Sequence, residues 1–324
     1  MHSPLRTILI TSCTNRKKAT GEVVRLYPSD KAKTVELLAK LWIARVNAAQ
    51  RREPASTLYR GRAFSEAKRS AYVAKAALFV VSAGHGIVNC DELLPSYDLT
   101  VAASSDNQLH SMLHRMNKTD TDWWQALTKN FAEPRSLVAL FNNHALENCI
   151  VLLAVPSTYL SMLHEDLMSL KDEHISRLRI ITSEFGAARL TGKLREMVLP
   201  YDERLEGNAS YAGTRNDFAQ RALRHFVEEL HGHELPFGIA HERVTSAMKV
   251  LTKRNPPIRE KKSDQSIEDL LLQNWHRCRG SQSSLLRWLR DDQLVSCEQG
   301  RFRLLWQRVK LRIAESSRGH NGEA

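Results

Sequence analysis

Four short apolar runs constrain the fold of this chain more than any other feature of its sequence. Each run is nearly continuous and rich in β-branched residues: 7–12 (TILITS), 78–82 (LFVVS), 149–156 (CIVLLAVP) and 178–183 (LRIITS). Strands covered by helices on both faces have this composition, because neither face meets water. Amphipathic helical patterns separate the runs, at residues 29–50, 65–77 and 159–170. The sequence therefore predicts an α/β fold with a doubly wound, mainly parallel sheet.

Interruptions of this pattern predict the domain organisation. An α/β domain is expected over residues 1–235, with a helical insertion at 102–145, where two tryptophans occur without a strand pattern. Proline, glycine and polar residues at 236–265 indicate a linker that contains one short helix. A disordered tail is expected at residues 316–324.

Residues 266–315 predict a second, small domain. Two helices are followed by a hairpin whose strands are 294–297 and 301–304, joined by a turn at Glu298-Gln299-Gly300. This is the order of elements in a winged-helix domain, which would place Arg287 and Arg290 at a DNA groove and its phosphates. A helical cap that packs on the main domain is the alternative.

The charge of the chain is unevenly distributed. Net charge is +11 and the pI is about 9.5. Residues 241–324 hold 17 Lys/Arg against 10 Asp/Glu, a net charge of +7, whereas the remainder carries +4. A basic C-terminal quarter favours nucleic acid as a partner.

Several classes of protein are disfavoured. No apolar run approaches the ~20 residues of a membrane helix, and the start does not resemble a signal peptide, so we expect a cytoplasmic protein with no membrane partner. The five cysteines are scattered and form no C-x-x-C pair, which disfavours disulfides and structural zinc. Neither a P-loop nor a strand–G-x-G-x-x-G–helix unit occurs. We therefore expect no metal and no cofactor.

Polar residues follow all four predicted strands. The strand ends read Ser12-Cys13-Thr14-Asn15-Arg16-Lys17, Ser82-Ala83-Gly84-His85-Gly86, Pro156-Ser157-Thr158-Tyr159 and Ser183-Glu184-Phe185-Gly186. In an open parallel sheet these ends meet at the carboxyl edge, where ligands bind. The sequence thus predicts one shared polar pocket.

Two residues at this edge have the chemistry of a catalyst. Cys13 precedes Arg16, Lys17 and Lys18, and nearby cations favour its thiolate. His85 lies between two glycines and could act as an acid or base. The alternatives are a cysteine that lines the pocket without reacting, and a histidine that holds its loop.

Carboxylates and arginines complete the predicted pocket. Asp98 could accept hydrogen bonds from a base or ribose, or else pair with Arg60 or Arg62. Glu184 could meet the ligand or cap a helix. Phosphate contacts are predicted for Arg16 and Arg189, which follow strand ends, and for Arg60 and Arg62, which precede the second predicted helix. A solvated basic loop is the alternative for Arg60 and Arg62.

The order of these motifs resembles the YaaA-like superfamily. The resemblance rests on "ILITSCTNRKK", "LYRGRAFSEAKRSA", "LFVVSAGHGIVNCDELLPSYDLTV" and "AVPSTYL", and it spans roughly residues 5–200. It implies an α/β domain that associates with nucleic acid. Some relatives belong to systems that install 7-deazaguanine bases in DNA, where the 7-cyano base is converted to the 7-amido form.

That resemblance implies a specific chemistry for the predicted residues. Cys13 would attack the nitrile carbon, Lys17 would lower the pKa of the thiol, and His85 or Glu184 would move protons or activate water. Base-binding residues would be Ser82, Gly84, Tyr97, Asp98, Ser157 and Tyr159. A carboxylate-activated water could replace the cysteine.

Three functions remain open from the sequence. The first is hydration of the nitrile of 7-cyano-7-deazaguanine in DNA, with DNA and other proteins of a modification system as partners. The second is a non-enzymatic DNA-binding protein. The third is a nucleobase glycosylase or nucleotide hydrolase that uses the same pocket.

Overall fold

The computed structural model describes residues 6–18, 21–101, 108–253 and 257–319. The chain divides into two compact units, Met1–Arg254 and Asn255–Ala324. The division falls inside the predicted linker, but helix α13 (Phe237–Val250) within that linker belongs to the first unit. Its residues Ala240, Val244 and Met248 are buried in the core of that unit. Among the described helices, none is both long and apolar enough to cross a membrane.

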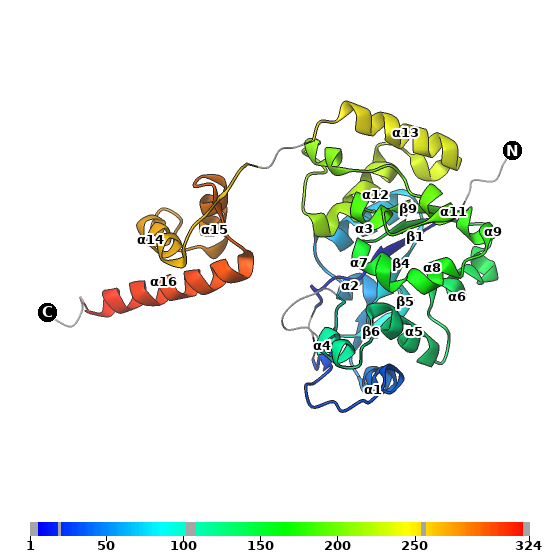
Figure 1. Ribbon diagram of the computed structural model, residues 1–324, viewed down its shortest axis with the longest axis horizontal. Helices are drawn as coiled ribbons and strands as arrows, with labels where there is room; N and C mark the ends of the chain where they lie inside the picture. The colour runs from blue at the N-terminus through cyan, green and yellow to red at the C-terminus, as the bar shows by residue number, and fades with distance from the viewer. Residues whose placement is uncertain (1–5, 19–20, 102–107, 254–256, 320–324) are drawn as a thin grey trace. The chain divides into compact units, whose positions relative to one another are not determined.

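A five-stranded sheet with the order β5-β4-β1-β8-β9 forms the centre of the first unit (Figure 1). Its strands are β1 (Thr7–Ser12), β4 (Ala77–Ser82), β5 (Gly86–Asn89), β8 (Ile150–Ala154) and β9 (Leu178–Ile181). Strands β4, β1, β8 and β9 are parallel, and β5 is antiparallel to β4. The predicted α/β class and mostly parallel sheet are therefore confirmed.

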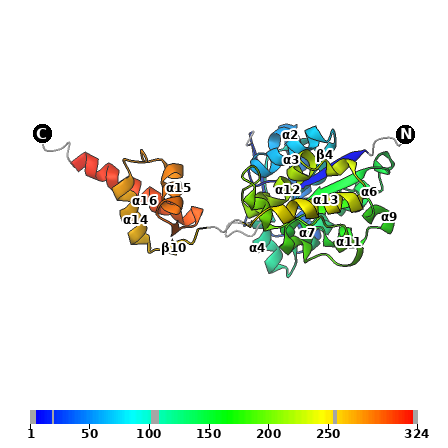
Figure 2. The same cartoon turned by 90° about the horizontal axis from the view of Figure 1, so that it is seen from above.

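The parallel strands coincide with the four apolar runs. All five residues of β8 and all four of β9 are buried, as expected for strands that helices cover on both faces. Figure 2 shows α3 and α12 on one side of the sheet and α7 on the other. Two short pairs lie outside this sheet: β2 (Val24–Arg25) with β7 (Tyr97–Asp98), and β3 (Arg52–Pro54) with β6 (Leu93–Pro95).

Thirteen α-helices are described in the first unit. Besides α13 they are α1 (Val35–Ala48), α2 (Ala55–Leu58), α3 (Arg62–Val73), α4 (Gln108–Arg115), α5 (Asp120–Asn130), α6 (Leu137–Phe141), α7 (Ser157–Met162), α8 (His164–Met168), α9 (Asp172–Ile175), α10 (Glu184–Ala187), α11 (Gly192–Glu196) and α12 (Phe218–Glu228). Single 3₁₀ turns occur at His144–Leu146, Glu203–Gly207, Arg215–Asp217 and Gly232–Glu234.

The predicted helical insertion is present in its described part. Helices α4, α5 and α6 occupy it, while its residues 102–107 lie outside the described ranges. Both tryptophans of α5 are fully buried, and their indole N–H groups donate to the Ala83 carbonyl (2.8 Å) and to Asp166 (3.0 Å). These bonds fix α5 to the end of β4 and to α8. The helix predicted at 159–170 is split into α7 and α8.

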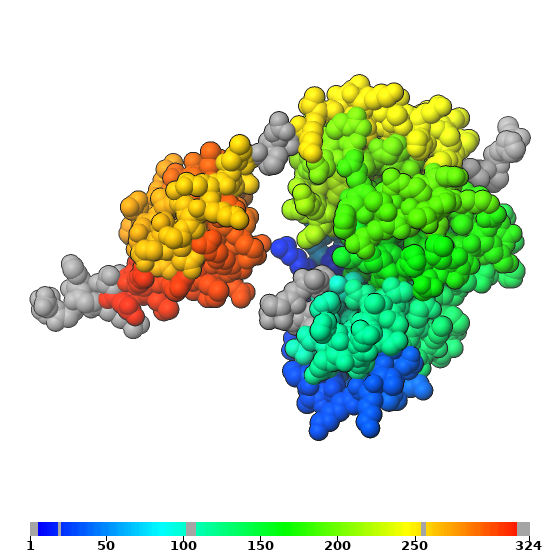
Figure 3. Space-filling view, in the orientation of Figure 1, coloured from blue at the N-terminus to red at the C-terminus, as the bar shows by residue number. Residues whose placement is uncertain are grey.

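The second unit is helical around a core of its own. It contains β10 (Glu260–Lys261), α14 (Asp264–Asn274), α15 (Gln282–Asp291), β11 (Val295–Ser296) and α16 (Gln299–Gly319). In Figure 3 the atoms of this unit, coloured yellow-orange to red, form one compact body. The core is built from Ile267, Leu271, Leu285, Trp288, Leu289, Val295, Cys297, Phe302, Leu305 and Val309.

The predicted hairpin of this unit is wrong. Residues 301–304 belong to α16, and β11 pairs in parallel with β10 instead. The reason is the spacing of Phe302, Leu305 and Val309, which places all three on one buried face of a helix. Helix α16 also includes residues 316–319 of the predicted tail, whereas residues 320–324 lie outside the description.

Candidate functional site

The carboxyl ends of β1, β4 and β8 meet at one place in the sheet. Strand β1 lies between β4 and β8, and Thr11 pairs with Val80 on one side and with Ala154 on the other. The chain goes from β1 to one neighbour and later returns to the opposite neighbour. Such a switch in strand order opens a crevice beyond the carboxyl ends, where α/β proteins bind ligands.

Cys13 occupies this switch point. It follows β1 directly, its backbone N–H donates to the Val81 carbonyl (2.9 Å), and its side chain is buried. Its Sγ lies 3.0 Å from the hydroxyl of Tyr159, and either atom can be the donor. Tyr159 is carried by α7, which begins three residues after the last residue of β8. The two predicted residues therefore join the ends of β1 and β8.

A second hydrogen-bond chain lies beside Cys13. The Tyr97 hydroxyl contacts Ser82 Oγ at 2.7 Å and the Tyr59 hydroxyl at 2.9 Å, all of them buried. Burial, together with the charge of Cys13, raises the pKa of Tyr59, Tyr97 and Tyr159 well above the ordinary range. These phenols stay protonated, so they are hydrogen-bond donors at every physiological pH.

Lys17 brings the one amine of this cluster. Its Nζ lies 4.2 Å from the centroid of the Tyr97 ring. Burial lowers the pKa of Lys17, while the nearby Cys13 and Asp98 oppose that change. A lowered pKa favours the neutral amine, which is the form that can act as a general base.

His85 is buried with its ring edge against Tyr97, at a centroid distance of 4.7 Å. Burial lowers the pKa of His85 to about 3, with further contributions from Arg135, Lys17 and Arg52. The imidazole is therefore neutral at physiological pH and cannot serve there as a general acid. Its Nε2 is buried and has no hydrogen-bond partner among the described residues.

Hydrogen bonds to Ser82 and close packing of glycines, and not the imidazole ring, hold the turn around His85. Ser82 Oγ accepts hydrogen bonds from the N–H groups of Gly84 (3.2 Å) and His85 (3.1 Å). A Cβ on Gly84 would lie 2.9 Å from both the Trp42 and Tyr97 rings, so close packing requires glycine there. Gly86 has a φ of +70° and faces Arg135 closely. Both glycines thus have structural roles.

The predicted carboxylates lie outside the buried cluster. Asp98 is exposed and pairs with Arg25 (3.5 Å), whereas the alternative left open by the sequence was a pair with Arg60 or Arg62. Glu184 is exposed in the first turn of α10, and the cap of that helix is Ser183, whose Oγ accepts from Gly186 N–H (3.2 Å). Ser157 begins α7 and is half-buried.

The predicted phosphate-binding residues divide into two kinds. Arg16, Arg60 and Arg287 have exposed side chains. The other three contact the protein itself: Arg62 donates to the Ala212 carbonyl (2.8 Å), Arg189 to Ser161 Oγ, and Arg290 to the Cys297 carbonyl (2.6 Å). The guanidinium of Arg290 ties α15 to the segment after β11, and its contact with DNA stays a prediction.

Residues that the sequence did not single out complete the edge. Gln220 on α12 is fully buried, and its Nε2 donates to Thr11 Oγ1 (3.0 Å) and to the Ala154 carbonyl (3.2 Å). It thereby connects the ends of β1 and β8. The sequence contained a signal for this residue: its helical spacing from Leu223 and Val227 places Gln220 on the buried face of α12. Asp120 at the start of α5 is half-buried, and burial raises the pKa of its carboxyl.

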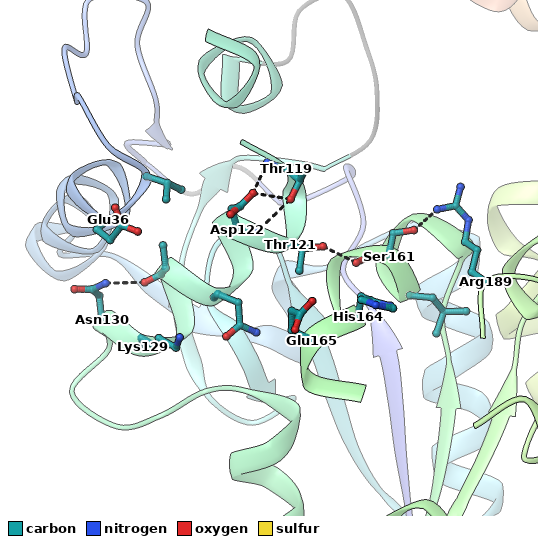
Figure 4. Close-up of a pocket in the computed structure, with 14 residues that line it drawn as sticks. Glu36, Thr119, Thr121, Asp122, Lys129, Asn130, Ser161, His164, Glu165 and Arg189 are labelled. Carbon is teal, nitrogen blue, oxygen red and sulfur yellow. Dashed lines mark hydrogen bonds between the residues drawn. The ribbon is translucent and has the colours of Figure 1, made fainter. Parts of the chain in front are cut away.

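A hollow of about 800 Å³ lies between α1, α5 and α7 (Figure 4). Its lining combines apolar side chains with charged ones of both signs, which include Glu36, Asp122, Lys129, Glu165 and Arg189. The Thr121 hydroxyl donates to the Ser161 carbonyl (2.8 Å), which links α5 to α7 across this hollow. Leu160 and Ser161 in the lining follow Tyr159 directly, so the hollow borders the helix that contacts Cys13.

These observations define an open α/β protein with a buried polar cluster at its topological switch point. Residues 44–132 match a family of unknown function (DUF6884). The matched segment contains Tyr59, Ser82, His85 and Tyr97, whereas Cys13 and Tyr159 lie outside it. Comparison with curated proteins found no match, and comparison with solved structures found none either.

Proposed function

We propose that this protein hydrates the nitrile of 7-cyano-7-deazaguanine in DNA to the 7-amido form, with Cys13 as the nucleophile. The observation that carries the proposal is the position of Cys13 Sγ at the switch point, 3.0 Å from the Tyr159 hydroxyl. The substrate comes from the resemblance of the sequence motifs to the YaaA-like superfamily, and within it to the DpdC proteins of 7-deazaguanine DNA modification. Partner proteins of such a system and a cytoplasmic location stay predictions.

The chemistry needs one nucleophile and one proton shuttle. The Cys13 thiolate adds to the nitrile carbon, a C–S bond forms, and the nitrogen takes up a proton to give a thioimidate. Water then adds to the same carbon, the C–S bond breaks, and the thiol and the amide are released. One water is consumed, and no oxidant or reductant is required.

Lys17 is assigned the proton transfer in this scheme. With its lowered pKa it can take the thiol proton and return it to the nitrile nitrogen. The Tyr159 hydroxyl is assigned a hydrogen bond to the same sulfur or to the developing N–H. His85 is neutral, and its role is a hydrogen bond through Nε2 to the guanine-like base. Glu184 is not given a catalytic role, since it is exposed outside the cluster.

The test is a single incubation with a matched control. DNA that carries 7-cyano-7-deazaguanine is incubated with the wild-type protein, digested to nucleosides and analysed by mass. With the wild-type protein we expect a nucleoside heavier by one water. In Cys13→Ala we expect the rate of its formation to fall by at least about 100-fold. Cys149→Ala is the control, because Cys149 is equally buried but precedes β8 at the opposite edge of the sheet. Full hydration by Cys13→Ala would contradict the covalent mechanism, and loss of the base would show a glycosylase.

A non-enzymatic DNA-binding protein is the second candidate. It is favoured by the burial of Cys13, which is 6% exposed and already hydrogen-bonded. In that case the buried cluster only holds the strand ends together. DNA binding with no change of the modified base in the same assay would favour this candidate.

A further inference from the structure

The C-terminal unit separates its paired charges from its unpaired ones. Asp264 contacts Arg301 (2.6 Å) and Arg308 (3.1 Å), and the buried Glu268 contacts Arg308 and Arg312 (both 2.9 Å). Asp264 and Glu268 therefore form ion pairs with three of the arginines of α16. These arginines hold α14 against α16 and are poorly placed to bind an external anion.

Among the other cations of this unit that have no acidic partner in the described residues, four lie close to Trp275 or Trp306 along the chain. They are Arg277, Arg279, Arg303 and Lys310, and all four are exposed. Arg303 and Lys310 share one face of α16 with Trp306, because their spacing of three and seven residues matches the helical repeat. Arg277 and Arg279 belong to the segment between α14 and α15.

Aromatic contacts bring this segment to the same face of α16. The half-buried rings of Trp306 and Trp275 are stacked, with centroids 6.0 Å apart and 23° between their planes. The Trp306 indole N–H donates to the Gly280 carbonyl (3.0 Å). Gly280 has a φ of +62°, and a Cβ there would lie 2.9 Å from the Trp275 ring. Lys310 Nζ lies 5.2 Å from the centroid of Trp306. We call Trp275, Arg277, Arg279, Arg303, Trp306 and Lys310 the tryptophan–arginine surface.

We propose that the tryptophan–arginine surface binds the phosphate backbone of DNA. Cations without acidic partners attract a polyanion, and release of counterions from the phosphates supplies the binding free energy. Half-buried aromatic rings among these cations are typical of nucleic-acid contacts. The inference rests on the proposed function in taking DNA as the partner. It adds α16 and the segment before α15 to the DNA contact predicted for Arg290 on α15.

The test uses the full-length protein and unmodified DNA. Binding of a fluorescently labelled duplex is measured by anisotropy at several salt concentrations for wild type and for Arg279→Gln/Lys310→Gln. We expect the double variant to bind about 10- to 30-fold more weakly near physiological salt, with the slope of log K against log salt reduced by about 2. Lys75→Gln is the control for loss of one positive charge and is matched to the single variant Arg303→Gln; Lys75 is exposed in the turn before β4, and we expect Lys75→Gln to bind DNA within about twofold of the wild-type affinity.

Further variants protect the test against misfolding. Arg303→Gln changes one exposed side chain, and we expect it to reduce the slope by about 1 with an unchanged melting temperature. Wild-type affinity and slope in both glutamine variants would overturn the proposal, as would equal surface-dependent binding of polyglutamate, which would show a general polyanion site. Surface-dependent binding of unmodified DNA without nitrile hydration would refute the proposed function and leave this surface standing.

Discussion

The two units use polar side chains in opposite ways. At the carboxyl edge of the sheet the hydroxyls of Tyr59, Tyr97 and Ser82 are neutral and buried, and the Tyr97 hydroxyl bonds to the other two. In the C-terminal unit the polar groups are charged, and most lie at the surface. Burial costs far less for a neutral group that keeps its hydrogen bonds than for a charge. The comparison teaches that polar groups buried at the sheet edge satisfy one another as neutral donors and acceptors, while charges of the C-terminal unit stay in contact with water.

Arg221 is the exception that extends this comparison. It lies fully buried in the first unit, and its guanidinium donates to Asp217 (2.8 Å), Glu206 (2.6 Å) and the Thr214 carbonyl (2.8 Å). A buried charge is tolerated there because its donors meet two carboxylates and carbonyl oxygens.

The largest expected effect follows from removing this charge. Arg221→Met leaves Asp217 and Glu206 without their partner, which we expect to cost about 3–5 kcal/mol in the free energy of unfolding of the first unit. Urea denaturation measures this change. A cost below about 1 kcal/mol would show that the ion pairs are as dispensable as surface ones.

Lowering the pH is expected to reduce the free energy of unfolding by a smaller amount. The folded-state pKa of His85 is about 3, below its unfolded value near 6.5, so its stabilising contribution is complete above pH 6.5 and is lost as pH falls toward 3. Between pH 7 and pH 4.5 this loss amounts to about 2–3 kcal/mol. His85→Asn cannot titrate, and we expect its stability to fall less over this range. Parallel pH dependence in the two proteins would show that the imidazole is not buried as described.

Removing one hydroxyl from the buried chain should have a moderate effect. Tyr97→Phe leaves the hydroxyls of Tyr59 and Ser82 without their shared partner. We expect the free energy of unfolding to fall by about 1–3 kcal/mol. Tyr72→Phe is the control, because Tyr72 is 87% exposed. Equal melting temperatures for both variants would contradict a bonded hydroxyl at Tyr97.

The smallest effect is expected at the surface of the C-terminal unit. Arg301→Gln removes an exposed pair with Asp264, which Arg308 still contacts, so we expect no resolved change in melting temperature. Hydrogen exchange of the α14 and α16 amides checks that these helices keep their stability. Strong loss of protection there would show that surface ion pairs, and not the apolar core, hold this unit.

The sequence predicted the sheet well because its signal is local. The run TILITS is β1 without any shift, since β-branched residues buried on both faces leave no other pattern. The prediction of a hairpin was wrong because apolar and charged residues alternate over 301–304 (RFRL), as in a strand. Only the longer spacing of Phe302, Leu305 and Val309 identifies a helix.

Side-chain direction at the candidate site was harder to predict. Tyr97 and Asp98 are neighbours in β7, so they point to opposite faces: Tyr97 enters the cluster and Asp98 faces solvent. Tyr59 and Gln220 reach the cluster through tertiary packing of α2 and α12, for which neighbouring residues in the sequence give little signal. The register and packing of these elements decide which polar residues meet.

The central claim is that Cys13 at the switch point of the sheet is the nucleophile. The most direct measurement is the mass of the Cys13 peptide after brief incubation with an oligonucleotide that carries 7-cyano-7-deazaguanine, followed by acid quench and nuclease and protease digestion. The account predicts a thioimidate adduct on the Cys13 peptide, with none on the Cys149 peptide. Hydration of the base with no adduct on Cys13, at undiminished rate in Cys13→Ala, would contradict it.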